Sequence, residues 1–416
     1  MNKIIFIRYI PLTKKIVEDF YMKDLIGFGY KVEYWDITKL FWNLTNEVEA
    51  YEPNEEDKIF IRRFSSKGEL KRAIHKDNRA LFISIMTFEW RIFFLFWYFT
   101  IFHCKKAVFS YRPMPIGEYS DDKELQTRNL SIFNRLRKTA LNPSKISIVI
   151  DVIKNRVKNK AMLFLLKYRV VNFYDYVFKG GEDGWKGIGP VPFSILDHTK
   201  IFEVNNWDYD RFLTSNISIE SKPYIVFLDE YYPFHPDGLM FFGKNINPEN
   251  YFKDMNHVFR ELEAYYKMPV VIAAHPKALK YKEHNYFEGR DVFFNATLEM
   301  VAKSSLVLAH DSLSTGYAVM CQKRILFVCS DEIKRTLPGN ARQIEAFSKY
   351  FKSPLVMAGK MTLEELPSDL TLPPNIEVIY NRLIKKCMTC VAPAVSNADL
   401  LKGYLKEIFN ETDKHV

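Results

Sequence analysis

Three stretches of sequence decide the fold, and each is a short apolar run that ends in polar residues. They read PYIVFLDEYYPFHPDG at 223–238, PVVIAAHPK at 269–277 and LVLAHDSLSTG at 306–316. Such runs are typical of buried strands, and the segments between them favour helices. Strands that alternate with helices predict a parallel sheet with right-handed crossovers. The polar residues should therefore meet at one edge, where such sheets bind ligands.

The same alternation extends over the rest of the chain. Strands are expected at 3–7, 31–35, 80–86, 107–111, 176–178 and 201–204, and again, after a polar linker at 214–223, at 224–228, 269–274, 292–294, 306–309, 324–329 and 355–357. The pattern predicts an α/β protein with an N-terminal domain over 1–215 and a second domain over 216–385, both Rossmann-like and facing a central cleft. Helices within 386–416 are expected to pack back across both domains.

Length and charge limit the possible partners. A chain of 416 residues is too long for one ordinary core and fits two domains. The net charge of +9 favours anionic partners such as a nucleotide, an acidic membrane surface or nucleic acid. The basic residues are spread and form no RNA- or DNA-binding motif, so a nucleic-acid partner is not expected.

The apolar run Ile92–Phe102 is far shorter than the roughly 20 residues that a membrane span needs. It predicts either a buried helix or a helix that dips into the membrane interface. Nothing at the N-terminus resembles a signal peptide, and the five cysteines form only one C-x-x-C pair, Cys387 and Cys390. These features favour a cytoplasmic protein, peripheral at the inner face of the membrane, with reduced thiols and no metal site. Basic residues over 135–160 would steer it to anionic lipid, unless they form an ordinary solvated helix face.

The first candidate site is the acidic pair Asp229-Glu230 at a predicted strand end. A carboxylate held there can act as a nucleophile, as a general base or as an acceptor for sugar hydroxyls. The alternative is a turn with solvated acids, because Pro233, Pro236 and Gly238 mark a turn.

The other two candidate loops contain groups that suit a phosphate. In His275-Pro276-Lys277 the imidazole can donate to a phosphate oxygen, the proline stiffens the loop and the lysine adds charge. Ser312, Ser314 and Thr315 offer hydroxyls at a strand-to-helix turn. Taken singly, a structural histidine and an ordinary helix cap explain these residues as well.

The ordered set of acidic, His-Pro and Ser/Thr motifs resembles GT-B glycosyltransferases that use CMP-activated acidic sugars. In motif order it is most similar to the retaining β-Kdo transferases of bacterial surface polysaccharide biosynthesis. This resemblance implies that Asp229 attacks the anomeric carbon, with Glu230 beside it and Asp237 close by. It also implies that His275-Pro276 and Ser314-Thr315 hold the CMP phosphate, with Lys277 and Ser312 nearby, and that no cofactor is needed.

The function implied by the resemblance is transfer of Kdo from CMP-Kdo to a lipid-linked or oligosaccharide acceptor of lipopolysaccharide O-antigen or capsule. Two alternatives stay open: transfer of a CMP-nonulosonic acid (sialic, legionaminic or pseudaminic acid) and a polyol-phosphate transferase of the same fold. The acceptor should lie on the first domain. There Glu182 and Asp183, in the glycine-rich segment 179–184, face the cleft or form a surface loop.

Overall fold

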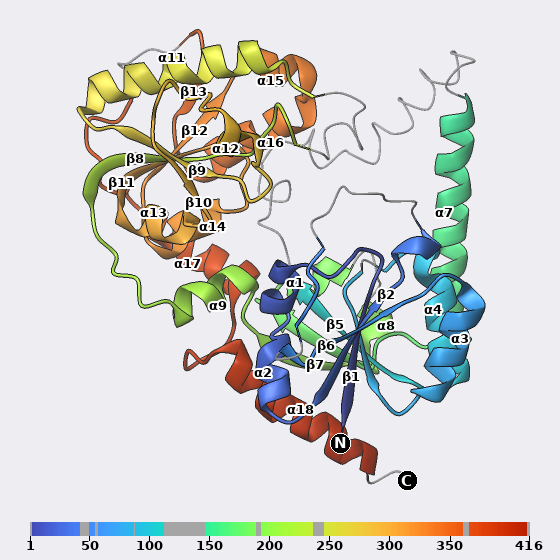
Figure 1. Cartoon of the computed structure of the whole chain (residues 1–416). Helices are drawn as coiled ribbons and strands as arrows, with labels where there is room; N and C mark the ends of the chain where they lie inside the picture. The colour runs from blue at the N-terminus through green and yellow to red at the C-terminus, as the bar shows by residue number, and fades with distance from the viewer. Residues whose placement is uncertain are drawn as a thin grey trace. The chain divides into compact units, whose positions relative to one another are not determined.

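The computed structural model describes residues 2–41, 50–54, 57–86, 88–111, 146–188, 193–235, 245–360 and 366–413. They form two compact units, each with its own sheet (Figure 1). Unit 1 takes residues 2–111, 146–213 and 386–413 of the described chain, and unit 2 takes residues 214–385. Asp237, Gly238 and the basic stretch before Ile146 lie outside the described residues.

Within the described residues, unit 1 has a parallel sheet of seven strands in the order β3-β2-β1-β4-β5-β6-β7. The strands are β1 (Lys3–Arg8), β2 (Lys31–Asp36), β3 (Phe60–Arg63), β4 (Leu81–Ser84), β5 (Lys105–Tyr111), β6 (Tyr176–Gly180) and β7 (Lys200–Val204). The chain runs outward from β1 to β3 and then crosses to β4 on the other side of β1. The crevice between β1 and β4 is therefore the topological switch point, where doubly wound sheets bind ligands.

Both faces of this sheet are buried, as the apolar run of β1 requires. Ile5 and Ile7 join one core cluster, and Ile4 and Phe6 join the other, because successive side chains of a strand point to opposite faces. The first cluster includes side chains of α3 (Lys67–Lys76), α4 (Phe93–Ile101), α7 (Ile146–Lys167) and α8 (Phe193–Leu196). The second includes side chains of α1 (Lys14–Asp19), α2 (Met22–Gly27) and α18 (Asn397–Asp413).

The aromatic segment forms a short helix of unit 1. Leu95, Phe96 and Phe99 of α4 lie in the core, whereas Trp97 is 44% and Ile101 38% exposed. The predicted buried helix is therefore buried on one side only. Among the described residues, no helix combines the length and the apolar character that crossing a membrane requires.

Unit 2 has a parallel sheet of six described strands in the order β10-β9-β8-β11-β12-β13. They are β8 (Lys222–Leu228), β9 (Val270–Ala274), β10 (Val292–Phe294), β11 (Ser304–Ala309), β12 (Ile325–Cys329) and β13 (Leu355–Met357). The helices between and after them include α11 (Pro248–Tyr266), α12 (Lys280–Glu283), α13 (Thr297–Lys303), α14 (Thr315–Met320), α15 (Asp331–Thr336), α16 (Pro338–Tyr350) and α17 (Ile376–Leu383). The prediction of two Rossmann-like α/β domains is confirmed, whereas the central cleft stays a prediction.

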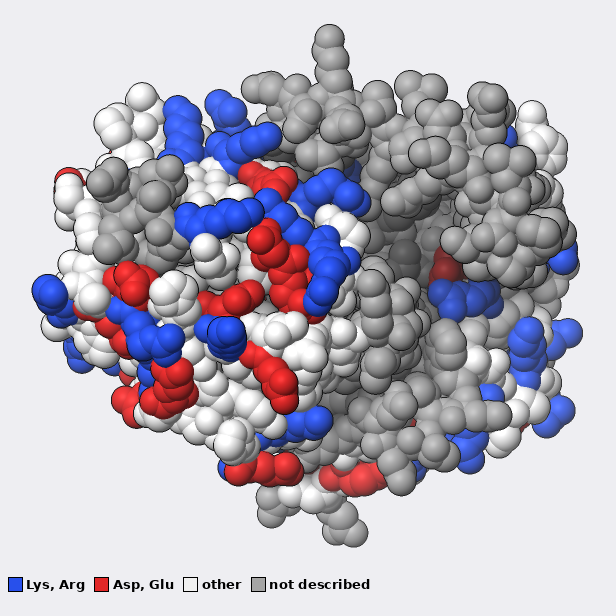
Figure 2. Space-filling model, turned by 90° about the horizontal axis from the view of Figure 1, so that it is seen from above, with Lys and Arg blue, Asp and Glu red and all other residues white. Residues whose placement is uncertain are grey.

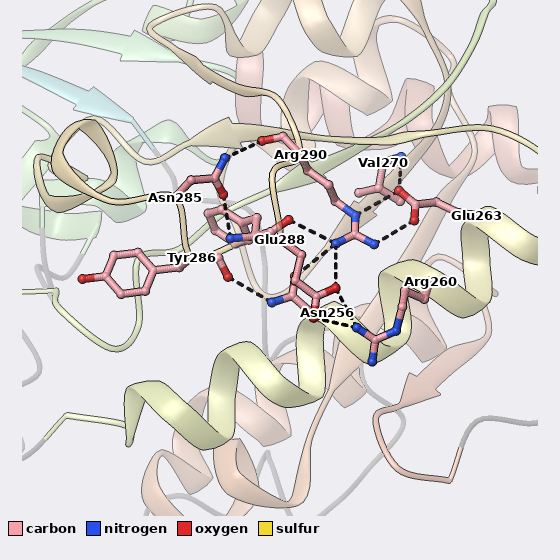
Figure 3. A network of polar contacts seen from close by, with 9 residues as sticks. Asn256, Arg260, Glu263, Val270, Asn285, Tyr286, Glu288 and Arg290 are labelled. Atoms are coloured by element: carbon pink, nitrogen blue, oxygen red, sulfur yellow. Dashed lines mark hydrogen bonds and ion pairs between the residues drawn. The ribbon is translucent and has the colours of Figure 1, made fainter.

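A polar network ties α11 to the amino end of β9 (Figure 3). Arg290 donates hydrogen bonds of 2.9 and 2.7 Å to the two carboxylate oxygens of Glu263 and one of 3.2 Å to Asn256. Glu263 also accepts the backbone N–H of Val270 at 3.0 Å. The Arg290 side chain is only 10% exposed, so these charge-assisted bonds are screened less than those of a surface pair. The strand that carries His275 at its far end is thus anchored at its start.

Two details differ from the sequence-based expectations. The edge strand β3 was not expected, because FIRR has no clear apolar alternation. The sequence pattern favours ordinary helix positions for both residues of the C-x-x-C pair, but Cys387 is in the π-helical turn Ile384–Met388 and Cys390 follows it. The described residues 386–413 belong to unit 1, where Leu401 and Leu405 of α18 enter the second core cluster, and packing across both domains stays a prediction.

Candidate active site

The three predicted loops meet at one edge of the unit 2 sheet. Strand β8 lies between β9 and β11, and its last residue, Leu228, pairs with Ala273 on one side and Ala309 on the other. The acidic loop after β8 therefore has the His-Pro loop as one neighbour and the Ser/Thr loop as the other. This arrangement confirms that the strand-end motifs come together, and it follows from parallel pairing of the three strands.

Asp229 is buried and occupied by neighbouring groups. It is 3% exposed, and its carboxylate accepts hydrogen bonds from the backbone N–H of His275 at 3.5 Å and the hydroxyl of Tyr281 at 3.3 Å. Burial raises the pKa of Asp229 to about 7, although hydrogen bonds from Tyr231, His275 and Tyr281 act in the opposite direction. In the ligand-free chain Asp229 thus positions the His-Pro loop.

Glu230 is the more accessible acid of the pair. It is half-buried, and its carboxylate is hydrogen-bonded to the side chain of Ser312 in the loop after β11. Burial and the nearby carboxylates of Asp311 and Asp229 together raise the pKa of Glu230 to about 8, against the opposing effect of the hydrogen bond with Ser312. A partly exposed carboxyl group with a strongly perturbed pKa at a strand end is a typical candidate for acid–base or nucleophilic work.

A buried polar group that sequence reasoning did not single out supports the loop after β11. His310 is fully buried; its Nδ1 donates to the carbonyl of Val328 at 2.7 Å, and its Nε2 accepts the Tyr251 hydroxyl at 3.0 Å. Burial lowers the pKa of His310 to about 4, so the imidazole is neutral at pH 7. The adjacent Asp311 accepts hydrogen bonds from Tyr232 and from Asn340. No local sequence pattern predicts that His310 supports this loop, because its partners Tyr251 and Val328 are distant in the chain.

The His-Pro loop exposes two of its three predicted residues. Pro276 and Lys277 are exposed and His275 is half-buried. The Nδ1 atom of His275 accepts the backbone N–H of Lys277 at 3.1 Å, which identifies Nε2 as the protonated nitrogen of the neutral ring. The ring of His235 lies 4.9 Å from that of His275, edge to face. His235 is therefore a further candidate, and its only sequence signal was its place in the acidic loop.

The Ser/Thr loop is less open than the motif suggests. Ser314 is half-buried at the start of α14, and its side chain makes no capping hydrogen bond. Ser312 is 4% exposed and accepts the backbone N–H of Ser314 at 3.2 Å. Thr315 is fully buried, and its hydroxyl has no hydrogen-bond partner in the described part of the chain. Of the three hydroxyls, only that of Ser314 is positioned to meet a ligand directly.

In unit 1, packing explains the glycine-rich segment that precedes Glu182 and Asp183. A Cβ atom on Gly180 would lie 2.5 Å from the ring of Tyr111, and one on Gly181, at φ +74°, would lie 2.7 Å from the carbonyl of Lys386. Asp183 donates its backbone N–H to that same carbonyl at 2.9 Å. Glu182 is exposed at the carboxyl end of β6, and a role for either acid in acceptor binding stays a prediction.

No family model matches the chain, and no curated protein matches it in sequence. Among solved structures it is similar to Os79 from O. sativa, in a complex with UDP, at 12% identity and a TM-score of 0.47 over 98% of this chain and 100% of that one. It is also similar to MurG from Acinetobacter baumannii, at 8% identity and a TM-score of 0.42 over 99% and 100% of the two chains. A variant of the wall teichoic acid polymerase TagF gives 10% identity and a TM-score of 0.43 over 100% and 89%.

Proposed function

We propose that the chain is a glycosyltransferase that moves Kdo from CMP-Kdo to a lipid-linked or oligosaccharide acceptor of a bacterial surface glycan. The observation that carries the proposal is the meeting of an acidic, a His-Pro and a Ser/Thr loop around the end of β8. The same three motifs, in the same order, are those that resemble the GT-B transferases of CMP-activated acidic sugars.

The exposed and half-buried side chains of the two outer loops suit a departing CMP. The phosphodiester of the donor leaves as a phosphomonoester, so negative charge grows on the phosphate in the transition state. Donors that already point at that charge lower the barrier. His275, through its protonated Nε2, and Lys277 would supply donors from one side, and the hydroxyl of Ser314 from the other.

We assign the reacting carboxylate to Glu230 and a positioning role to Asp229. The resemblance places the nucleophile at Asp229, but that side chain is 3% exposed and holds the His275 backbone and the Tyr281 hydroxyl. Glu230 is half-buried and hydrogen-bonded to Ser312, so a reaction at its carboxylate would break fewer hydrogen bonds than one at Asp229. Attack by the Glu230 carboxylate on the anomeric carbon would form a glycosyl-enzyme, and a second displacement by an acceptor hydroxyl would give net retention.

The test is a donor panel incubated with the full chain and a mixture of lipid-linked oligosaccharides. CMP-Kdo should release CMP and give a glycan heavier by one Kdo residue, whereas UDP-sugars should not react. Transfer from a CMP-nonulosonate instead would change the sugar but keep the site. Transfer of a polyol phosphate, or release of nucleotide only from UDP-sugars, would overturn the proposal.

A separate observation favours contact with an anionic membrane. On and just after α7, Val157, Phe164 and Tyr168 are 62%, 59% and 61% exposed, and their spacing places them on one helix face. The sequence from 152 to 174 has six Lys or Arg residues and no acid. Exposed apolar side chains among lysines suit the interface of an anionic bilayer. On the face shown in Figure 2, basic and acidic side chains are intermixed on the left, whereas Lys and Arg predominate among the described side chains on the right.

The membrane proposal is tested by sedimentation with vesicles that contain about a third anionic lipid. Val157→Glu should reduce binding, whereas Val378→Glu, a change at a residue of 57% exposure in unit 2, should not. Equal binding of both variants and the unchanged protein would contradict it.

A further inference from the structure

Three side-chain donors near the carboxyl edge of the unit 1 sheet are buried without a partner. Arg8 ends β1, Tyr111 ends β5, and Trp207 begins the helix α9 (Trp207–Thr214). The Nε of Arg8, the hydroxyl of Tyr111 and the indole N–H of Trp207 make no hydrogen bond with the described residues. Buried polar groups are normally paired, so three unpaired donors at one edge need an explanation.

The three donors lie around the C-terminal end of α1. The carboxylate of Asp19, the last residue of α1, acts electrostatically on both Arg8 and Tyr111. The ring of Phe20, the next residue, lies 5.4 Å from that of Trp207, which in turn lies 4.5 Å from the ring of Tyr111. Tyr111 and Trp207 pack against the second core cluster, on the sheet face to which Arg8 also points by strand alternation.

Arg8 forms no ion pair with the described residues, although the carboxylate of Asp19 lies near enough to act on its charge. Asp19 forms ion pairs with Lys15, at 3.0 Å, and with Arg211, and none with Arg8. No ion pair of Arg8 exists among the described residues, and burial lowers its pKa. A half-buried arginine whose Nε is enclosed without a partner is costly, and an anion that binds beside it removes part of that cost.

The topology points to the same place. Arg8 is the last residue of β1, on one side of the β1/β4 switch point, where doubly wound sheets bind their ligands. A guanidinium binds carboxylate or phosphate with two parallel hydrogen bonds, and a phenol and an indole N–H can add single ones. All three unpaired atoms can donate, so the ligand must supply acceptors.

We propose that unit 1 binds an oxyanion of the acceptor, a carboxylate or a phosphate, through Arg8, with Tyr111 and Trp207 as further donors. This inference rests on the proposed function, because it treats unit 1 as the acceptor side. It also narrows that function, since a neutral oligosaccharide would leave the half-buried cation without an ion pair.

The experiment titrates the full chain with glucuronate, with glucose 1-phosphate and with neutral glucose. Intrinsic fluorescence reports unit 1, because all six tryptophans of the sequence fall within residues 35–207. At least one of the anions should bind and glucose should not, and the preferred anion tells whether the acceptor offers a carboxylate or a phosphate. Arg8→Met should weaken that binding by about tenfold or more, and Tyr111→Phe by about threefold.

Matched variants separate a binding role from a structural one. Arg91→Met, at an exposed arginine paired with Glu89, and Tyr404→Phe, which loses a surface hydrogen bond, should leave anion binding unchanged. Without ligand, Arg8→Met should melt at a higher temperature than the unchanged chain, because it removes a half-buried charge that has no ion pair. A structural arginine would give a lower melting temperature.

Three results would overturn the inference: neither anion binds, binding survives Arg8→Met and Tyr111→Phe, or it is lost only in His275→Ala. The last result would place the anion in unit 2. If Arg8→Met does not fold, Tyr111→Phe decides alone. Binding of CMP, measured separately by calorimetry, shows whether the proposed function fails together with the inference or survives it.

Discussion

Replacing Asp229 by asparagine should change how the stability of unit 2 depends on pH. Burial raises the pKa of Asp229 from its usual 3.8 to about 7. Because the folded pKa is the higher one, the unfolded chain ionises first as the pH rises. The stability associated with this carboxyl group is therefore fully present below about pH 3.8 and is lost progressively up to about pH 7.

The size of the effect follows from these two values. A difference of roughly three pKa units corresponds to about 4 kcal/mol in total. Between about pH 5.5 and about pH 8.5, the part still to be lost is about 2 kcal/mol. The side chain of the Asp229→Asn variant would stay neutral, and its amide can replace the hydrogen bonds with His275 and Tyr281 if the tyrosine hydroxyl turns from donor to acceptor.

Hydrogen exchange of the β8 backbone, followed by mass spectrometry, measures this difference. At each pH the Asp229→Asn variant is compared with the unchanged chain, so intrinsic exchange rates cancel. The ratio of the two exchange rates should shift about 30-fold in favour of the variant from about pH 5.5 to about pH 8.5. Asp291→Asn, at an exposed aspartate of the same unit, should show no such shift. A ratio for Asp229→Asn that is the same at both pH values would refute the buried-carboxyl account.

Three further predictions concern the site and its support. Glu230→Gln should lower kcat for sugar transfer by about a thousandfold or more. In the unchanged enzyme kcat/KM should rise with pH up to about 8, because the nucleophilic carboxylate must be ionised. Near-normal transfer by the variant would exclude Glu230 as the nucleophile. His275→Ala should raise the Kd for CMP about tenfold in calorimetry, whereas a change at the exposed His284, His284→Ala, should not. If His275→Ala binds CMP as tightly as the unchanged chain, the His-Pro loop does not bind the phosphate. Arg290→Met should lower the free energy of unfolding by about 2–3 kcal/mol in urea, because it leaves Glu263 unpaired. Arg260→Met removes an ion pair with Glu288 that is about half exposed, so it should lower the free energy of unfolding by under about 1 kcal/mol. A larger loss for Arg260→Met than for Arg290→Met would contradict a stabilising role of the Arg290 network.

The fold and the meeting of the three loops could be predicted because their signals are local. An apolar run such as IVFL before Asp229 marks a buried strand by itself, and parallel pairing then brings strand ends to one edge. The strand β3 lacked such a signal, since its sequence FIRR lies at an edge and is largely open to solvent. The glycines before Glu182 predict a loop, either at the cleft or on the surface, but no local pattern shows that Gly180 and Gly181 are required by close contacts with Tyr111 and Lys386.

By itself, the sequence determined that two parallel sheets form and that acids, a His-Pro pair and hydroxyls follow three strands of one sheet. The reason is that strand and helix periodicities depend only on residues close together in the chain. Only the tertiary structure decided that Asp229 is enclosed by Tyr281, 52 residues away, while Glu230 stays half-exposed. It alone also brought the unpaired donors of Arg8, Tyr111 and Trp207 to the end of α1. Burial and electrostatic pairing are set by contacts between distant segments, which no local pattern contains.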